Sequence, residues 1–393
     1  MRLGVALACA LGPAAALADS APAAVTGGDS ARSGKWPDVA AVLYPEFTGD
    51  EARCTGTLIA PTLVLTAAHC WESGPDNVLI GATSLARRGD GETIPIARGF
   101  TYPDPDATLD AAVLVLARPS SRAPRQLATG WARLGIVAGA RVALVGFGAV
   151  DPAGTEYVNE LQEATTTITD PDCTASSGCN PGARPAGELG AGGTGTDTCP
   201  GDSGGPLYLV TARGAWLAGV TSRSYDDATR ACGDGGIYVR ADKLAGWIEA
   251  VTGVTLRRAS EPRADRLVAQ RGDGAETRVA VNDPEAGAHR FAITSPPAHG
   301  AAAVRDDGAL RVCAAPDAPP GDDAVTVTIT DAQRPERALA ITVPIEIRDG
   351  EPPTAACDVL AFDRGGCCDS RAGATSALPL ALAVLAIARR RRR

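Results

Sequence analysis

The residue whose surroundings most clearly indicate chemistry is Ser203, in the stretch Cys199-Pro200-Gly201-Asp202-Ser203-Gly204-Gly205-Pro206. A serine hydroxyl is almost fully protonated at neutral pH and becomes a nucleophile when a neighbouring base takes its proton. The flanking glycines let a substrate carbonyl approach the backbone, whose N–H groups can then stabilise an oxyanion. The stretch therefore indicates nucleophilic attack on a carbonyl and requires a base elsewhere in the chain.

The base can be identified from the positions of the histidines. Residues 201–205 also fit the G-x-S-x-G turn of α/β-hydrolases, so the serine motif alone leaves two folds open. That fold alternates strands with long helices and places its histidine after its serine. In residues 25–253 no such helices are predicted, and the single histidine, His69, precedes Ser203, while His289 and His299 lie further on. A serine hydrolase built from residues 25–253 can therefore use only His69 as its base.

Short apolar runs separated by Gly, Pro, Asp and Asn predict strands around these residues. The runs lie at residues 39–43, 57–59, 63–65, 111–116, 140–149, 206–210, 216–221 and 236–240. So many short strands predict an all-β region of closed or nearly closed antiparallel sheets. One helix is predicted after them, with apolar residues at i, i+3, i+4 and i+7 from Leu244, a cap at Asp242 and an end at Gly253.

Residues 254–349 are expected to form a separate small β-sandwich. Residues 324–329 and 339–347 alternate with period two, and Asp306-Asp307-Gly308 predicts a hairpin turn. Pro344 inside the second run predicts an edge strand. The segment Pro297-Ala298-His299-Gly300 resembles immunoglobulin- or cadherin-like modules of bacterial surface proteins, which implies a surface or polymer ligand for this module.

Composition and the start of the chain indicate an exported protein. The length of 393 residues suits two domains plus processing segments, and eleven cysteines indicate an oxidising compartment. Residues 1–18 have the pattern of a secretory signal peptide, followed by a short propeptide at 19–24. The net charge is −9 and the acidic residues are dispersed, so the sequence predicts no basic surface that would bind nucleic acid.

The end of the chain combines a linker, residues 350–375, with an apolar segment and Arg389 to Arg393, within residues 376–393. The apolar segment is shorter than the ~20 residues of a spanning helix. The order of Cys367-Cys368, apolar segment and arginines resembles the C-terminal surface-sorting tails of myxobacterial secreted proteins. That resemblance implies a secreted, surface-attached protein that contacts the membrane only through this tail, and a plain tail anchor stays open as the alternative.

Residues 25–253 resemble the trypsin/chymotrypsin family of serine proteases. The motifs that carry the resemblance are Thr66-Ala67-Ala68-His69-Cys70, residues 109–114, Gly146-Phe147-Gly148, residues 201–206 and Gly236-Ile237-Tyr238-Val239. The resemblance implies two antiparallel β-barrels with a C-terminal helix, and a serine endopeptidase acting on proteins or peptides without a cofactor. Asp110 would complete a triad with His69 and Ser203, and the N–H groups of Gly201 and Ser203 would form the oxyanion hole.

The resemblance also assigns substrate specificity. Asp197 lies six residues before Ser203, where trypsin-like members carry the carboxylate that binds a substrate arginine or lysine. Ser222, Ser224 and Gly236 would bind substrate, although Arg223-Ser224 replaces the usual Trp-Gly. Three alternatives stay open: Asp197 as a solvated loop residue, a protease with another preference, and an inactive protease-like surface adhesin or scaffold.

The remaining implications concern activation and disulfides. Val25 looks like the mature N-terminus, whose ammonium would pair with Asp202, and Ala24 before it predicts release by an enzyme that prefers small residues. The expected disulfides are Cys54–Cys70, Cys199–Cys232 and Cys173–Cys179, while the pairing of Cys313 is left open, with Cys357 as one candidate partner. No metal site is predicted.

Overall fold

The computed structural model describes residues 25–45, 54–103, 109–183, 187–285, 287–350 and 357–363. The predicted signal peptide, the propeptide, Cys367-Cys368 and the sorting tail lie outside these residues. Within the described ranges, no helix has the length and apolar character needed to cross a membrane.

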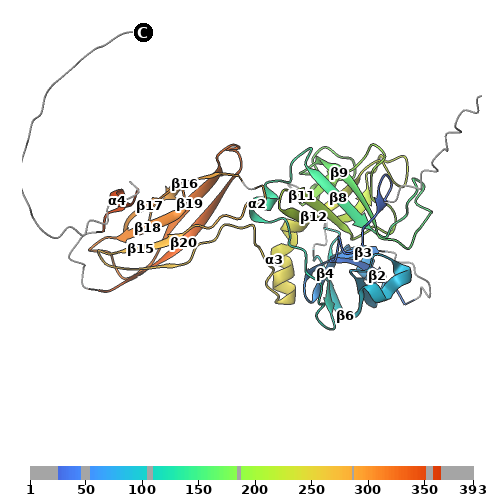
Figure 1. The fold of residues 1–393 in the computed structure, drawn as a ribbon, viewed down its shortest axis with the longest axis horizontal. Helices are drawn as coiled ribbons and strands as arrows, with labels where there is room; N and C mark the ends of the chain where they lie inside the picture. The colour runs from blue at the N-terminus through green and yellow to red at the C-terminus, as the bar shows by residue number, and fades with distance from the viewer. Residues whose placement is uncertain are drawn as a thin grey trace, which may run out of the picture. The chain divides into compact units, whose positions relative to one another are not determined.

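Six antiparallel strands close the first barrel, in the order β2-β3-β4-β7-β6-β5 (Figure 1). β2 to β4 are buried along their whole length, because their inward side chains fill the barrel and their outward ones are covered. Its elements are β2 (Val39–Leu43), β3 (Cys54–Ala60), β4 (Leu63–Thr66), α1 (Ala68–Glu72), β5 (Asn77–Ile80), η1 (Leu85–Asp90), β6 (Glu92–Thr101) and β7 (Ala112–Leu116).

The second barrel follows in the chain, with the strand order β1-β9-β10-β13-β12-β11-β8 and closure by pairing of β8 with β9. Its elements are β1 (Asp29–Ser30), α2 (Gly130–Arg133), β8 (Arg141–Gly146), β9 (Gln162–Asp170), η2 (Pro181–Ala183), β10 (Glu188–Ala191), β11 (Pro206–Thr211), β12 (Gly214–Ser224) and β13 (Gly236–Arg240). The predicted architecture of two antiparallel barrels is confirmed.

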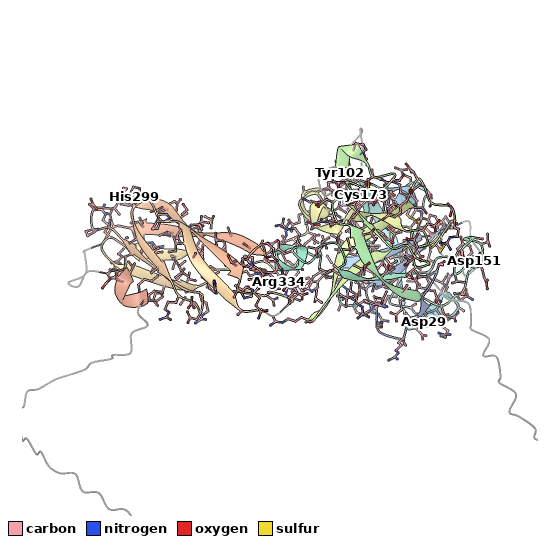
Figure 2. All side chains as sticks on the ribbon, turned by 90° about the horizontal axis from the view of Figure 1, so that it is seen from above. Asp29, Tyr102, Asp151, Cys173, His299 and Arg334 are labelled. Atoms are coloured by element: carbon pink, nitrogen blue, oxygen red, sulfur yellow. A yellow bond between two sulfur atoms is a disulfide. The ribbon has the colours of Figure 1, made fainter. Side chains whose placement is uncertain are left out.

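The predicted helix is α3, Ala241–Thr252, and Gly253 ends it with a φ of 70° that favours glycine. Trp247 packs on the core as expected, with its ring 5.3 Å from that of Tyr102, which Figure 2 labels. The prediction that Asp242 caps the helix was wrong. Because β13 runs directly into α3, the cap position is Arg240 and Asp242 falls inside the first turn, where its carboxylate binds the Arg240 guanidinium at 2.8 Å.

The C-terminal strands form two sheets, β14-β20-β19-β16 and β15-β18-β17. The elements are β14 (Leu267–Gln270), β15 (Gly274–Arg278), β16 (His289–Ser295), β17 (Gly300–Val304), β18 (Ala309–Ala314), β19 (Gly321–Asp331), β20 (Ala338–Arg348) and α4 (Val359–Asp363). The turn at Asp306-Asp307-Gly308 is confirmed, since Val304 pairs with Leu310. The edge position predicted from Pro344 was wrong: β20 lies inside its sheet, and proline is accommodated because pairing with the short β14 begins at Ile345.

Internal contacts divide the chain into two compact units. The first comprises Met1–Asp265, Val279–Ala292 and Val327–Thr342, and the second Arg266–Arg278, Ile293–Thr326 and Val343–Arg393. Both barrels belong to the first unit, and so do all the residues of the candidate site. The domain boundaries expected from the sequence stay a prediction.

Candidate active site

His69 and Asp110 are brought together by two paired strands of the first barrel. His69 lies in α1, which follows β4, and Asp110 precedes β7. β4 and β7 pair with Thr66 opposite Ala112, so the ends of these strands meet. The Nδ1 atom of His69 lies 2.9 Å from Asp110 Oδ2, and the backbone N–H of His69 donates to Asp110 Oδ1 at 3.2 Å. The carboxylate therefore fixes both the ring and the backbone of the histidine.

The electrostatics of this pair set the protonation of the imidazole. The hydrogen bond with Asp110 raises the pKa of His69 despite the opposing effect of burial. Burial by itself would raise the pKa of Asp110, but hydrogen bonds from His69 and Ser222 together with the charge of His69 outweigh it and lower that pKa. Because an ionised Asp110 accepts from Nδ1–H, the neutral imidazole leaves Nε2 as its proton acceptor.

Ser203 lies on a turn of the second barrel that packs directly on the segment leading to His69. The Ser203 carbonyl accepts a hydrogen bond from Thr55 N–H at 2.8 Å and lies 3.5 Å from Cys70 Sγ. Gly204 has a φ of 77°, and a Cβ atom there would overlap Thr66 Oγ1 and lie 2.7 Å from Ala67 N. Glycine at this position therefore permits the close approach of the two barrels beside Ser203 and His69.

Two backbone N–H groups of the same turn are oriented by the carbonyls that precede them. The Pro200 carbonyl accepts from Ala149 N–H at 2.9 Å, and the Asp202 carbonyl accepts from Gly205 N–H at 2.8 Å. In a trans peptide the C=O and the next N–H point in opposite directions. The N–H groups of Gly201 and Ser203 consequently point away from Ala149 and Gly205, respectively, and the hydrogen bonds of the preceding carbonyls fix their directions.

Asp202 is a fully buried carboxylate. It accepts hydrogen bonds from Gly148 N–H at 2.8 Å and Cys199 N–H at 2.9 Å, and across the described ranges no Lys or Arg side chain forms an ion pair with it. Burial raises the pKa of Asp202 to about 7, although the two amides partly offset that effect. Val25 is buried as well, and the carbonyl of the next residue, Thr26, accepts from Asp197 N–H at 3.3 Å. The segment beginning at Val25 thus packs on the loop that leads to Asp202.

Asp197 is 1% exposed, so it is not a solvated loop residue. Its carboxylate accepts from Thr198 N–H at 2.7 Å and Gly235 N–H at 2.9 Å, and burial nevertheless raises its pKa to about 6. A Cβ atom on Gly236 would lie 3.4 Å from Asp197 Oδ1, and one on Gly192 would lie 3.2 Å from it. Neither glycine therefore places a side chain against this carboxylate.

Ser222 makes a contact that sequence reasoning missed. It was expected only to bind substrate, but its hydroxyl donates to Asp110 Oδ2 at 2.7 Å. Ser224, the last residue of β12, pairs with Gly236 of β13. Arg223 forms an ion pair with Glu188, a residue that no motif marked, because their contact depends on how β10, β13 and β12 pair.

The structure joins Cys54–Cys70, Cys173–Cys179 and Cys199–Cys232, the three pairs expected from the sequence. It also joins Cys313 to Cys357, a pairing that the sequence left open. The ligand atoms of Cys54, His69 and Cys70 lie within 4.8 Å of one another, the spacing of a metal site. The two sulfurs form a disulfide, however, and the thiolate is the form of cysteine that binds metals. This cluster is therefore a disulfide beside the histidine.

Comparison with known proteins gives concordant matches. The family model described as Trypsin matches residues 25–248. Human serine protease 56 is 31% identical over 270 residues, covering 65% of this chain and 43% of the relative. Trypsin of Saccharopolyspora erythraea is 30% identical over 224 residues, covering 55% of this chain and 92% of the relative.

Two further similarities have partial coverage. Mouse transmembrane protease serine 11E is 29% identical over 241 residues, covering 58% of this chain and 55% of the relative. The solved structure of neuropsin, a serine protease expressed in the limbic system of mouse brain, has 27% identity and a TM-score of 0.47, covering 57% of this chain and 98% of that one. The chain thus spans about half the length or less of human serine protease 56 and of mouse transmembrane protease serine 11E.

Proposed function

This chain belongs to the trypsin family of serine proteases, and from this premise we propose that it is a serine endopeptidase that cleaves proteins or peptides after Arg or Lys. The observation that carries the proposal is the His69–Asp110 pair, at 2.9 Å, beside the turn that holds Ser203. This arrangement combines a candidate nucleophile, a base and a group that orients the base.

In the proposed mechanism, Ser203 Oγ attacks the scissile carbonyl while His69 Nε2 takes its proton. The resulting imidazolium, stabilised by Asp110, gives the proton to the leaving amine, and water then repeats the sequence on the acyl-enzyme. The oriented N–H groups of Gly201 and Ser203 bind the oxyanion that forms in each step. One such donor contributes roughly 10²–10³ to turnover.

The proposed specificity depends on Asp197. Its carboxylate is buried, and among the described residues no Lys or Arg side chain forms an ion pair with it, so a cationic substrate side chain would supply the missing charge partner. Asp197→Asn is expected to lower kcat/KM for arginyl and lysyl peptide amides by about 100-fold or more, since a buried charge loses its partner. Hydrolysis of a phenylalanyl amide should change little. The assay uses the exported full chain, with the exposed Asp227→Asn as matched control.

The same carboxylate makes a second readout possible. Because the pKa of Asp197 is about 6 in the free protein, Asp197 becomes neutral as the pH falls through that value. The ratio of kcat/KM for an arginyl substrate to that for its uncharged citrulline analogue is therefore expected to fall about tenfold per pH unit below pH 6. A ratio that stays constant from pH 7 to 4.5, or a preference for aromatic substrates, would exclude Asp197 as the specificity residue.

We also propose that the protein is exported and attached to the cell surface through residues 376–393. The four disulfides of the described chain support an oxidising compartment. A chain that ends at Asp363, and so keeps the Cys313–Cys357 disulfide, is expected to appear in the culture medium, while the full chain stays with the cells. Equal release of both forms would contradict the role of the tail.

A further inference from the structure

Arg223 lies at the centre of a hydrogen-bond chain that ends at the candidate active site. Its guanidinium donates to both carboxylate oxygens of Glu188, at 2.8 and 3.1 Å, and to the Gly178 carbonyl at 2.8 Å. It also donates to Ser222 Oγ at 3.2 Å, and Ser222 in turn donates to Asp110 Oδ2 at 2.7 Å. One arginine thereby connects a buried carboxylate to the group that holds His69.

A bulge in β12 makes the contact between neighbouring side chains possible. Successive side chains of a regular strand point to opposite faces, which would separate Ser222 from Arg223. The pairing of β12 with β13 shifts between Thr221 and Arg223, so that Ser222 is the extra residue. A bulge redirects side chains locally, and here Ser222 and Arg223 converge on one region.

The donor and acceptor properties of the three groups leave one arrangement. A guanidinium can only donate, an ionised carboxylate can only accept, and a serine hydroxyl has a single hydrogen. With Arg223 donating to Ser222 Oγ, the hydroxyl hydrogen is directed to Asp110. We propose that Arg223 is a positioning residue of the active site, which fixes the Ser222 hydroxyl as a permanent donor to Asp110.

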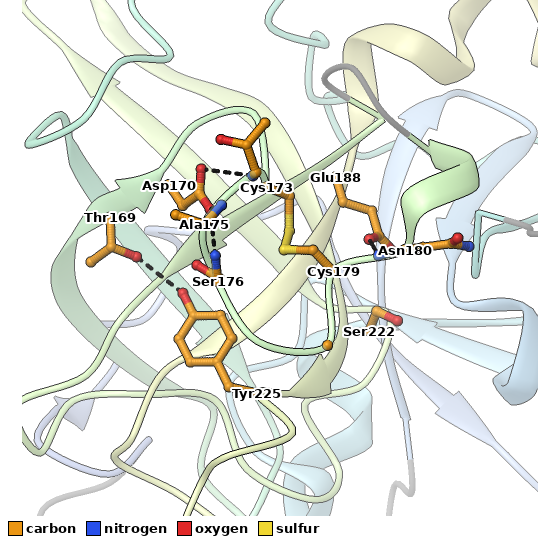
Figure 3. Close-up of a disulfide and its surroundings, with 12 residues drawn as sticks. Thr169, Asp170, Cys173, Ala175, Ser176, Cys179, Asn180, Glu188, Ser222 and Tyr225 are labelled. Atoms are coloured by element: carbon orange, nitrogen blue, oxygen red, sulfur yellow. Dashed lines mark hydrogen bonds between the residues drawn. A yellow bond between two sulfur atoms is a disulfide. The ribbon is translucent and has the colours of Figure 1, made fainter.

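Arg223 is anchored by a buried carboxylate, and the two side chains form a pair without net charge. The Glu188 side chain is 1% exposed, and its carboxylate also accepts from Asn180 N–H at 2.8 Å. Gly178 and Asn180 flank Cys179, which the disulfide joins to Cys173 in the loop that Figure 3 shows beside Glu188 and Ser222. Because the Glu188 carboxylate balances the charge of Arg223, the guanidinium affects Asp110 mainly through the Ser222 hydroxyl. Direct electrostatic attraction between Arg223 and Asp110 contributes less.

This inference rests on the proposed function, in which Asp110 serves His69. Without a fixed donor, the Asp110 carboxylate is less stabilised as an anion, and it holds the proton of the imidazolium more strongly. The double variant Glu188→Gln/Arg223→Met removes the anchor without leaving an unpaired buried charge. It is expected to raise the pKa of His69 by about 0.5–1 unit.

The experiment follows the His69 ring proton by NMR from pH 4 to 9, in full-length protein with Ser203→Ala to prevent self-digestion. Besides Asp110, the charged group that acts on His69 is Glu72, on the same helix, and it is unchanged in every variant. Ser222→Ala should give the same rise, and combining it with the double variant should add nothing further. Glu276→Gln/Arg311→Met, a matched Arg–Glu pair of the second unit, should leave the pKa unchanged.

An unchanged His69 pKa in Glu188→Gln/Arg223→Met would overturn the proposal, and so would a shift that persists fully in the Ser222→Ala background. Should the double variant not fold, Arg223→Lys is expected to give a smaller rise, because one ammonium cannot satisfy Glu188, Gly178 and Ser222 together. The titration requires no turnover. A wild-type chain without peptidase activity would contradict the proposed function while leaving this reading of Arg223 intact.

Discussion

Replacing Ser203 by alanine is expected to lower kcat for arginyl peptide amides by about 10⁶-fold, because no other group can form the acyl-enzyme. Binding should survive, since the carboxylate of Asp197 and the backbone N–H groups of Gly201 and residue 203 are retained. The measurement is kcat of the purified full chain, together with covalent labelling by an organophosphonate that reacts with activated serines. The variant should be neither active nor labelled.

Ser33→Ala, at an exposed turn and outside the contacts described for the site, is the matched control and should keep full activity. Equal activity of Ser203→Ala and the wild-type protein would remove the catalytic assignment. If neither protein is active or labelled, while both bind an arginyl inhibitor, the chain is a binding protein built on a protease fold.

Retaining Ala24 before Val25 is expected to lower kcat/KM by about 10³-fold or more. The amine of Val25 is then an amide and carries no charge, so the buried Asp202 has no cation beside it. The turn that presents the N–H groups of Gly201 and Ser203 loses its anchor, and each such donor is worth roughly 10²–10³. Asp202→Asn in a chain that begins at Val25 should cause a loss of similar size. N-terminal sequencing of the active form checks the site, and an active form with a start far from Val25 would contradict it.

Stability against pH gives an independent measurement of the same pairing. With Val25 in peptide linkage, the pKa of Asp202 is about 7, well above the 3.8 of a free aspartate. Because the folded protein holds this proton more tightly than the unfolded chain, Asp202 contributes to the free energy of unfolding below pH 3.8. This contribution is lost as the pH rises from 3.8 through 7, and a shift of about three pKa units corresponds to roughly 4 kcal/mol. The free energy of unfolding of the Ala24-containing form should fall accordingly relative to Asp202→Asn. In the form that begins at Val25, where the ammonium pairs with Asp202, this fall should be absent.

The strands and the helix could be predicted because their signals are local. Apolar runs bounded by turn residues mark β2 and β13 to the residue, and Gly253 marks the end of α3. The two errors have a common origin in tertiary context. Asp242 is a residue type that often caps helices, but here it lies in the first turn and binds Arg240. Pro344 lies in an interior strand, where it is accommodated because the neighbouring strand β14 is short and pairs only from Ile345 onward.

The residues of the candidate site could be predicted only where they lie in a recognisable sequence motif. His69, Asp110 and Ser203 lie in recognisable segments, whereas Glu188 and Arg223 meet across three strands and a bulge. No local sequence pattern specifies the register of these strands. A shift of the pairing by one residue would turn the side chains of the shifted strand to the other face of the sheet. The contact of Ser222 with Asp110 was missed for the same reason.

The contact of Gly204 with Thr66 and Ala67 has a consequence for inactivation. Ser203, the proposed nucleophile, comes from one barrel and His69, its proposed base, from the other, and the Ser203 carbonyl accepts a hydrogen bond from Thr55 N–H across that boundary. Sliding of the barrels by an ångström or two would separate Ser203 from His69 while both strand networks stay intact, and small misplacements of reacting groups cost rate steeply. The proposed peptidase activity should therefore depend on how the two barrels dock. On heating, it should disappear before the circular dichroism of the strands changes.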